Sequence, residues 1–240
     1  MSDEQRAAAQ RISHWTVHVE AVDEAGTVVA SLVLAHGADP GAELARRGWS
    51  VTDGREVRQE GATLTIVLDV THTPSAAPVA DEKVRVEDGL TAAEVASATP
   101  YQRVAVYAIV ETARGLLLTE LSEKTWVPGE WTLPGGGIDP GESALEALHR
   151  EVWEETDQTI TDVEFLGVLT SHWIGRSPGG RVEDFQAVRL YYRGHCPAPS
   201  DPVVHDVDGS TASAAWVPRT RLESVPVTSS LAPALAQWLD

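Results

Sequence analysis

Three glutamates in the middle of the chain have the residue type and the spacing to bind a divalent cation. Glu151, Glu154 and Glu155 lie at positions i, i+3 and i+4, and 3.6 residues per turn would place their carboxylates within an arc of about 100° on one helix. Like charges at i and i+4 destabilise a helix, so a positive partner is expected beside them. Hard oxygen ligands that leave room for water and phosphate suit Mg²⁺ or Mn²⁺.

A glycine-rich segment comes directly before this predicted helix. Gly135 to Gly137 leads through the turn signal Asp139 to Gly141 into residues with helical spacing and no internal Gly or Pro, a pattern typical of a loop that feeds a helix. Leu145, Leu148 and Val152 form a neighbouring stripe, which we expect to pack on a core. The pattern predicts a helix with one buried face and an adjacent acidic face.

These residues together resemble the Nudix box, the signature of the Nudix hydrolase family. The box reads G-x5-E-x7-R-E-U-x-E-E-x-G-U, with U aliphatic, and the chain matches it at seven positions: Gly136, Glu142, Arg150, Glu151, Val152, Glu154 and Glu155. It departs at the end, where Asp157 replaces the Gly and Gln158 the aliphatic residue. The Gly normally ends the helix in a left-handed turn, which Asp adopts less readily. The departures therefore concern the helix end and its packing rather than the metal ligands.

The resemblance implies a fold, an activity and a set of roles. It implies an α/β/α sandwich around a mixed sheet and hydrolysis of a nucleoside diphosphate linked to another moiety, with Mg²⁺ or Mn²⁺ as cofactor. The metal ligands would be Glu151, Glu154, Glu155 and the carbonyl of Gly135, while Gly136, Glu142 and Arg150 would brace the loop against the helix. The general base varies in this family: it is a glutamate of the box, here Glu151 or Glu154, or an acid from a later loop.

A second segment, SHWIGRSPGGRVEDF at residues 171–185, supplies further candidates. It reads as a loop between strands, of a length that usually carries function or mobility. Glu183 and Asp184 are its candidate bases, although both are also ordinary solvated loop acids. Arg176 and Arg181 could grip phosphate in forked geometry, or be plain surface arginines. Trp131, just ahead of the glycines, either packs or stacks on a nucleotide base.

The composition limits which binding partners and which cellular compartment are expected. The net charge of −18 argues against a nucleic-acid surface and fits a small nucleotide-type substrate whose charge is met by a metal ion and a few arginines. The single Cys196 indicates a reducing, cytoplasmic setting. No run of apolar residues approaches the length of a membrane span. A homodimer is a possible assembly.

Hydrophobic alternation predicts a small α+β domain over residues 1–72, with a ββαββ order. Its elements are strands over 15–21, 28–34 and 64–70, the last paired near 55–58, and a helix over 40–47 that Asp39 would cap. His14, His18 and His36 could be imagined as a metal set, but solvated histidines are ordinary on the polar face of a strand.

Residues 73–99 read as a linker with one short helix, for which Thr91 and Glu94 form a capping box. Residues 100–240 read as the Nudix hydrolase domain. Its predicted elements are strands over 104–110, 116–121, 163–170, 186–192 and 214–217 and a final helix over 231–239.

Two other readings compete with a hydrolase. One is a catalytically weak Nudix-fold module that binds or regulates, which Asp157 and the unassigned N-terminal domain make conceivable. The other is an isomerase on the same scaffold, which would need a catalytic cysteine; Cys196 lies in a Pro-rich segment and is a poor candidate. The identity of the substrate is not readable from these residues.

Overall fold

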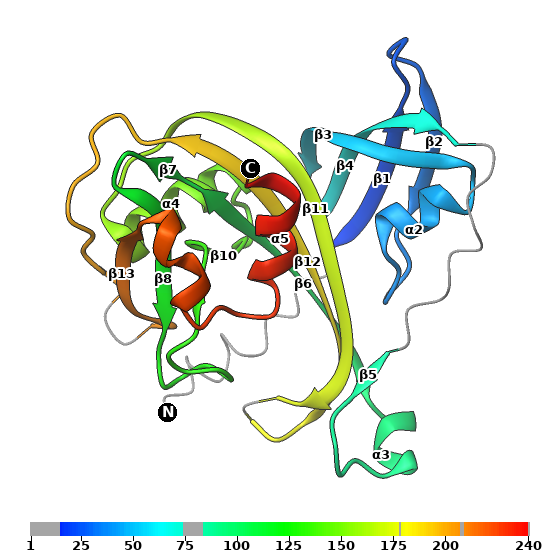
Figure 1. Cartoon of the computed structure of the whole chain (residues 1–240). Coiled ribbons are helices and arrows are strands. Elements are labelled where there is room, and N and C mark those ends of the chain that lie inside the picture. The colour runs from blue at the N-terminus through cyan, green and yellow to red at the C-terminus, as the bar shows by residue number, and fades with distance from the viewer. Residues whose placement is uncertain (1–14, 74–83, 178, 207–208, 240) are drawn as a thin grey trace. The chain divides into compact units, whose positions relative to one another are not determined.

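The computed structural model describes residues 15–73, 84–177, 179–206 and 209–239 (Figure 1). Within it the chain forms two units of dense internal contact. The first unit contains the chain up to Val104 together with Thr170–Val188, and the second contains Ala105–Leu169 and the chain from Arg189 onward.

The first unit is built on a four-stranded sheet with the order β2-β1-β4-β3. Its strands and helix follow the predicted ββαββ order: β1 Thr16–Val22, β2 Val28–Val33, α2 Pro40–Ala45, β3 Trp49–Glu60 and β4 Thr63–His72. β1 pairs antiparallel with β2 and parallel with β4, and β3 and β4 form an antiparallel hairpin. Alternate apolar side chains are buried on one face, among them Val17, Val19 and Ile66, as the period of two predicts.

Local capping determines where both short helices of this unit begin. Asp39 accepts a hydrogen bond from the Ala42 N–H at 2.8 Å and starts α2. The predicted capping box of Thr91 and Glu94 is present and starts α3, Ala92–Ala96, which follows the short strand β5, Arg85–Val86. Most of the predicted linker, residues 74–83, lies outside the described residues.

Three long strands contribute residues to both units: β6 Thr99–Ile109, β11 Thr161–Arg176 and β12 Val182–His195. The sheet that contains them has the order β10-β6-β12-β11-β5. The expectation of a long loop over residues 171–185 was therefore wrong, because β11 continues to Arg176 and β12 begins at Val182. Trp173 and Ile174 pair with β5, and the ring of Trp173 lies 5.5 Å from that of Phe185. Partners distant in sequence thus override the low strand propensity of this glycine-containing stretch.

The second unit carries the remaining elements. They are β7 Glu111–Thr112, β8 Gly115–Leu121, β9 Trp131–Thr132, β10 Gly135–Gly137, α4 Ala144–Thr156, β13 Thr211–Val217, the 3-10 helix η1 Arg219–Ser224 and α5 Leu231–Trp238. A sheet with the order β13-β8-β7, to which β9 adds by pairing with β8, faces a core that includes Leu116, Leu118 and Leu231. From about residue 100 the chain has the predicted α/β fold with mixed sheets, preceded by the β-rich sheet of the first unit.

The buried face of α4 differs in part from the predicted stripe. Leu148 and Val152 are fully buried as expected, but Leu145 is 48% exposed. Ala144, Ala147, Glu155 and Thr156 complete the buried face instead. Leu145 has a direction between those of Val152 and Thr156, but it lies in the first turn of the helix and is exposed there.

None of the described helices has the length and apolar character needed to cross a membrane.

Candidate functional site

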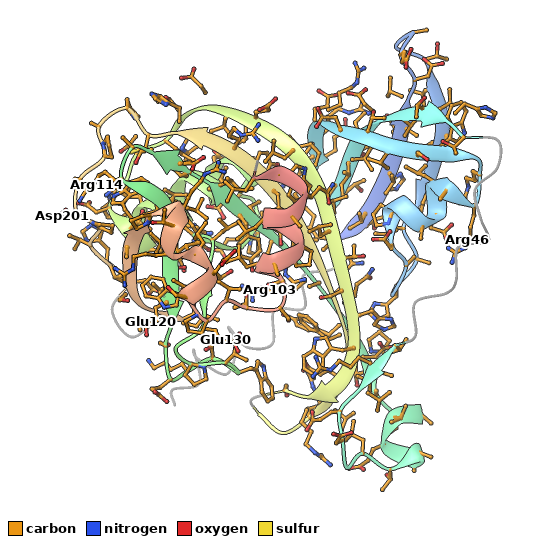
Figure 2. The ribbon with its side chains drawn as sticks, viewed as in Figure 1. Arg46, Arg103, Arg114, Glu120, Glu130 and Asp201 are labelled. Carbon is orange, nitrogen blue, oxygen red and sulfur yellow. The ribbon has the colours of Figure 1, made fainter. Side chains whose placement is uncertain are left out.

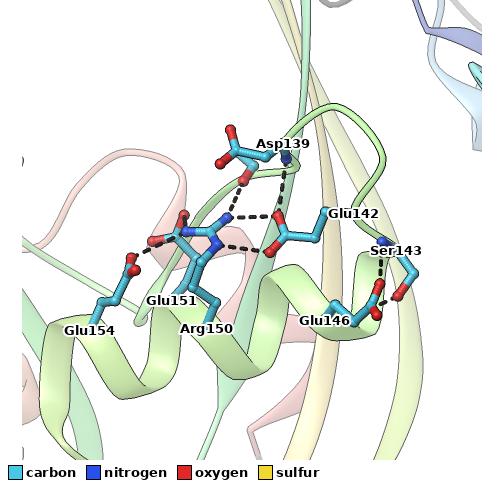
Figure 3. Close-up of polar contacts among 8 residues, drawn as sticks. Asp139, Glu142, Ser143, Glu146, Arg150, Glu151 and Glu154 are labelled. Carbon is cyan, nitrogen blue, oxygen red and sulfur yellow. Dashed lines mark hydrogen bonds and ion pairs between the residues drawn. The ribbon is translucent and has the colours of Figure 1, made fainter.

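Helix α4 begins with a capping box that joins it to the turn after the glycines. The hydroxyl of Ser143 accepts from the Glu146 N–H, and the Glu146 carboxylate accepts from the Ser143 N–H at 2.8 Å. Just before it, Glu142 accepts from the Asp139 N–H at 3.0 Å (Figure 3). These contacts fix the register of the helix relative to the glycine segment.

Arg150 lies at the centre of the site, and Figure 3 shows it surrounded by acidic side chains. Its guanidinium donates two hydrogen bonds to Glu142, at 2.7 and 2.8 Å, and one to the carbonyl of Gly137 at 3.1 Å. It also donates to Glu151 at 2.8 Å and to Glu154 at 3.2 Å. The hydrogen bonds from Arg150 lower the pKa of Glu142, and hydrogen bonds to the acids raise the pKa of Arg150. Arg150 is thus a positive partner of Glu151 and Glu154.

Glu155 differs from the other two glutamates because it is buried. It is only 5% exposed, and its carboxylate accepts from the backbone N–H of Gly135 at 2.9 Å and from the hydroxyl of Thr211 at 2.5 Å. Burial raises the pKa of Glu155 to about 8, although both hydrogen bonds act in the opposite direction. A cation beside this carboxylate would favour its charged form.

The glycine segment is a short strand rather than the expected loop. Gly135 to Gly137 form β10 and pair antiparallel with β6. The Ala108 N–H donates to the carbonyl of Pro134, so Gly135 occupies the next, non-hydrogen-bonded position of the ladder. Its N–H and its carbonyl therefore both point away from β6, toward the side on which its N–H meets Glu155.

Close packing explains why glycines form this strand. A Cβ on Gly135 would lie 2.1 Å from the carbonyl oxygen of Val106, and a Cβ on Gly136 would lie 2.4 Å from a carboxylate oxygen of Glu151. The absence of side chains lets α4 bring two of its carboxylates against the backbone of β10. Glu151 and Glu155 thus meet the backbone of β10, and Arg150 binds Glu151 and Glu154. Among the described residues, the three glutamates do not form a group whose ligand atoms all lie within 4.8 Å of one another.

The candidate residues of the 171–185 segment have partners within the first unit. Glu183 is bound by Arg181, with a shortest distance of 2.7 Å, and Arg176 donates to Glu94 at 2.7 Å. Asp184 contacts two histidines, His172 and His36. All of these residues belong to the first unit, whereas the acidic face of α4 belongs to the second.

Trp131 lies in β9 of the second unit. It pairs with Glu120 of β8, and its side chain packs partly against the hydrophobic core.

The first departure from the box, Asp157, takes the left-handed conformation that Gly usually supplies. Its φ is 57°, and its carboxylate contacts Nε2 of His205 at 2.7 Å. The ring of His205 stacks on Trp153 with a centroid distance of 4.5 Å, and the backbone N–H of His205 donates to the carbonyl of Glu154. A segment distant in sequence therefore closes the helix end in this chain.

The second departure, Gln158, is a buried anchor for the segment 196–206 that follows β12. It is 2% exposed, its amide nitrogen donates to the hydroxyl of Ser200 and its oxygen accepts from the Ser200 N–H, both at 3.0 Å. Arg114 pairs with Asp201 of the same segment (Figure 2), and the Trp216 indole donates to the Ser200 carbonyl at 2.8 Å. A polar residue replaces the aliphatic one because it binds this segment.

Replacing Gln158 with Leu, the residue type of the box pattern, is expected to destabilise the protein by about 1–3 kcal/mol, because the Ser200 N–H loses its acceptor in a buried position. Urea denaturation would measure the change. Gln237→Leu in α5, at an exposed glutamine, is the control and should change stability by less than about 0.5 kcal/mol. Equal stability of the Gln158→Leu protein and the wild type would contradict the anchoring role.

The sequence predicted neither the hydrogen bond from Thr211 to Glu155 nor the burial of Glu155. Thr211 lies 56 residues beyond Glu155, and a lone Thr carries no motif. Helical spacing does indicate the burial of Glu155, because at 100° per residue its side chain points between those of Leu148 and Ala144 on the buried face.

Comparison with known proteins identifies the family to which the chain is similar. The family model of the NUDIX domain matches residues 101–239. The nucleoside triphosphatase NudI of Escherichia coli O1:K1 is 38% identical over 94 residues, which cover 38% of this chain and 67% of that protein. NudI of Enterobacter sp. strain 638 is 40% identical over 60 residues, 25% of this chain and 43% of that protein. The chain thus spans only part of the length of these relatives.

Among solved structures, a NUDIX hydrolase from Nitrosomonas europaea aligns with a TM-score of 0.44 and 22% identity, over 57% of this chain and 88% of that one. The MutT NUDIX hydrolase from Burkholderia pseudomallei aligns with a TM-score of 0.43 and 24% identity, over 57% of this chain and 98% of that one.

Proposed function

Because this chain belongs to the NUDIX domain family and is an enzyme of the Nudix pyrophosphohydrolase type, we propose that it cleaves a diphosphate linkage in a nucleoside diphosphate linked to another moiety. One observation carries this proposal. Two carboxylates of α4, those of Glu151 and Glu155, meet the backbone of β10, and Arg150 binds Glu151 and Glu154 from the same helix. These contacts hold the acids near β10 and support the proposed cation site.

The residues fit a hard divalent cation, Mg²⁺ or Mn²⁺. Glu151, Glu154, Glu155 and the Gly135 carbonyl would hold it with oxygen atoms only, the donor set that such ions take. Glu155 in particular is a carboxylate that burial destabilises in its charged form, so a bound cation would relieve that cost. When bound, the ion supplies charge neutralisation of phosphate oxygens and a lowered pKa for a coordinated water.

The general base is best assigned within the box. The side chain of Glu154 is 35% exposed, against 15% for that of Glu151, so water can reach it more readily. Glu183 and Asp184, the alternatives, are bound to Arg181 and to two histidines, and Glu154 is itself bound by Arg150 at 3.2 Å, so the exposure of Glu154 is what favours it. Arg176 and Arg181 as phosphate contacts, and Trp131 as a base-stacking residue, stay predictions.

Three other functions are less well supported than this one. Nucleoside triphosphates are a second substrate class, because the related NudI proteins are named nucleoside triphosphatases and a triphosphate also contains the anhydride. A catalytically weak binding module is disfavoured because the chain keeps every acidic ligand and the Arg150 brace. An isomerase that uses Cys196 is disfavoured because that thiol is buried and burial raises its pKa.

A substrate panel tests the proposal. We expect Mg²⁺-dependent hydrolysis, followed by phosphate release after phosphatase treatment, of at least one compound among nucleotide sugars, dinucleoside polyphosphates, ADP-ribose and nucleoside triphosphates, and its loss when the cation is chelated. Cleavage of triphosphates alone would move the assignment to the second class. Binding of the same compounds without turnover would establish the binding module instead.

A further inference from the structure

Two histidines and one aspartate meet in the first unit, outside the acidic face of α4, and we propose that they form a second cation site that takes a transition-metal ion such as Zn²⁺. His36 follows β2, His172 lies in β11 and Asp184 lies in β12. One ligand atom from each lies within 4.8 Å of the others. The proposal does not rest on the proposed hydrolysis, because it concerns binding of an ion by residues that lie outside the Nudix box.

Both imidazoles approach the same carboxylate oxygen of Asp184. Nε2 of His36 lies 3.2 Å from Oδ1 of Asp184, and Nε2 of His172 contacts the same oxygen. In a tetrahedral zinc site with bonds of about 2.0–2.2 Å, neighbouring ligand atoms lie roughly 3.3 Å apart. The two imidazole rings are nearly perpendicular, at 83° with centroids 5.3 Å apart, so both nitrogens approach one carboxylate without the rings stacking.

The backbone next to His36 is shaped around His172. Gly37 has a φ of +78°, and a Cβ at this position would lie 2.6 Å from two atoms of the His172 ring. Only a residue without a side chain allows the chain to pass this closely. The contact holds the His172 ring in the orientation that directs its Nε2 to Asp184.

The segment that carries His36 is also fixed by hydrogen bonds to β11 and β12. The amide of Gln186 donates to the carbonyl of Ala38 at 2.9 Å, and the hydroxyl of Thr170 donates to Asp39 at 2.8 Å. Asp39 is at the same time the N-cap of α2. Ligands held in place by such contacts lose little freedom when they bind an ion.

Ligand chemistry separates this site from the acidic face of α4. Imidazole nitrogens suit Zn²⁺ and its neighbours, whereas an all-oxygen set suits Mg²⁺. The side chains of His36, His172 and Asp184 are 27%, 20% and 24% exposed, so the ion can enter and water can occupy the fourth position. An ion there would tie the segment between β2 and α2 to the β11–β12 pair.

The test uses the tag-free full-length protein in excess Mg²⁺, in a Glu154→Gln, Glu155→Gln background that weakens the acidic face. Titration with Co²⁺, read by its visible absorption, is expected to show one site per chain that Zn²⁺ displaces. His36→Gln and His172→Gln should each weaken Co²⁺ binding at least tenfold. Gln keeps a hydrogen-bond donor toward Asp184, and circular dichroism would check that both variants fold.

His205→Gln is the matched control. His205 also contacts an aspartate, Asp157 at 2.7 Å, but among the residues that the structure describes it joins no group of three such ligands. It should bind Co²⁺ as the background protein does. A titration without saturable Co²⁺ binding would overturn the proposal, and so would equal affinity in all three histidine variants.

Anomalous scattering at the zinc edge from crystals gives a second measurement that needs no variant. A peak at His36, His172 and Asp184 is expected, and a peak only elsewhere would overturn the site.

Discussion

Glu154→Gln and Glu155→Gln are each expected to lower Mg²⁺-dependent hydrolysis at least a hundredfold while the protein stays folded. Gln has the shape of Glu but lacks the charge with which a carboxylate binds a hard cation. In the Glu155→Gln variant the amide oxygen can still accept from the Gly135 N–H or from Thr211, the two donors that hold Glu155 in the wild type. Turnover of the best substrate from the panel and the urea midpoint would be measured for each variant.

The chain offers a matched control for this pair on the same helix. Glu146 occupies the first turn of α4 and serves the capping box, a position at which Gln also works. Glu146→Gln should therefore keep turnover within about threefold, since it stands apart from the predicted ligands. Near-wild-type turnover in both the Glu154 and the Glu155 variants would remove the proposed metal site.

Assays of Glu183→Gln and Asp184→Asn beside these variants locate the base. A base within the box predicts that neither substitution matches the loss caused by Glu154→Gln. A loss of the same size in one of them alone would transfer the role of base to that residue.

Gly136→Ala is expected to lower turnover about a hundredfold and to change the free energy of unfolding by less than about 1 kcal/mol. The new Cβ would lie 2.4 Å from one oxygen and 2.8 Å from the other oxygen of the Glu151 carboxylate, so this carboxylate must move. It is the end of a flexible side chain, which makes the move cheap for stability, whereas a displacement of about 1 Å at a reacting centre can cost a hundredfold in rate.

Substitutions at two further glycines distinguish displacement of Glu151 from a general loss of stability. Gly135→Ala should lose stability as well as activity, because its Cβ would meet the backbone of Val106 at 2.1 Å and its φ is +152°. Gly179→Ala, whose nearest contact would be the Ser177 hydroxyl at 3.8 Å, should change neither. Wild-type turnover in Gly136→Ala would show that the position of Glu151 does not limit catalysis.

Local patterns predicted the parts of the fold whose causes are local. Asp39 and Thr91 cap the helices that follow them, as predicted, and alternation located β1, β2 and β4. The extension of β11 and β12 through residues 171–176 and 182–185 was missed, because a strand formed by pairing with β5 and by ring contacts such as that of Trp173 with Phe185 has its cause elsewhere in the chain.

For the acidic face, the order of residues alone predicted the chemistry: which residues are acids, that they share one side of a helix, and that a glycine segment precedes them. The folded arrangement was needed to show that Glu155 is buried between Gly135 and Thr211. It also showed that Asp157 and Gln158 bind a segment more than 40 residues away, and that His36 meets His172. Spacing along one helix is dictated by its 3.6-residue period. Contacts between segments far apart depend on how the sheets pair, and no local pattern encodes that pairing.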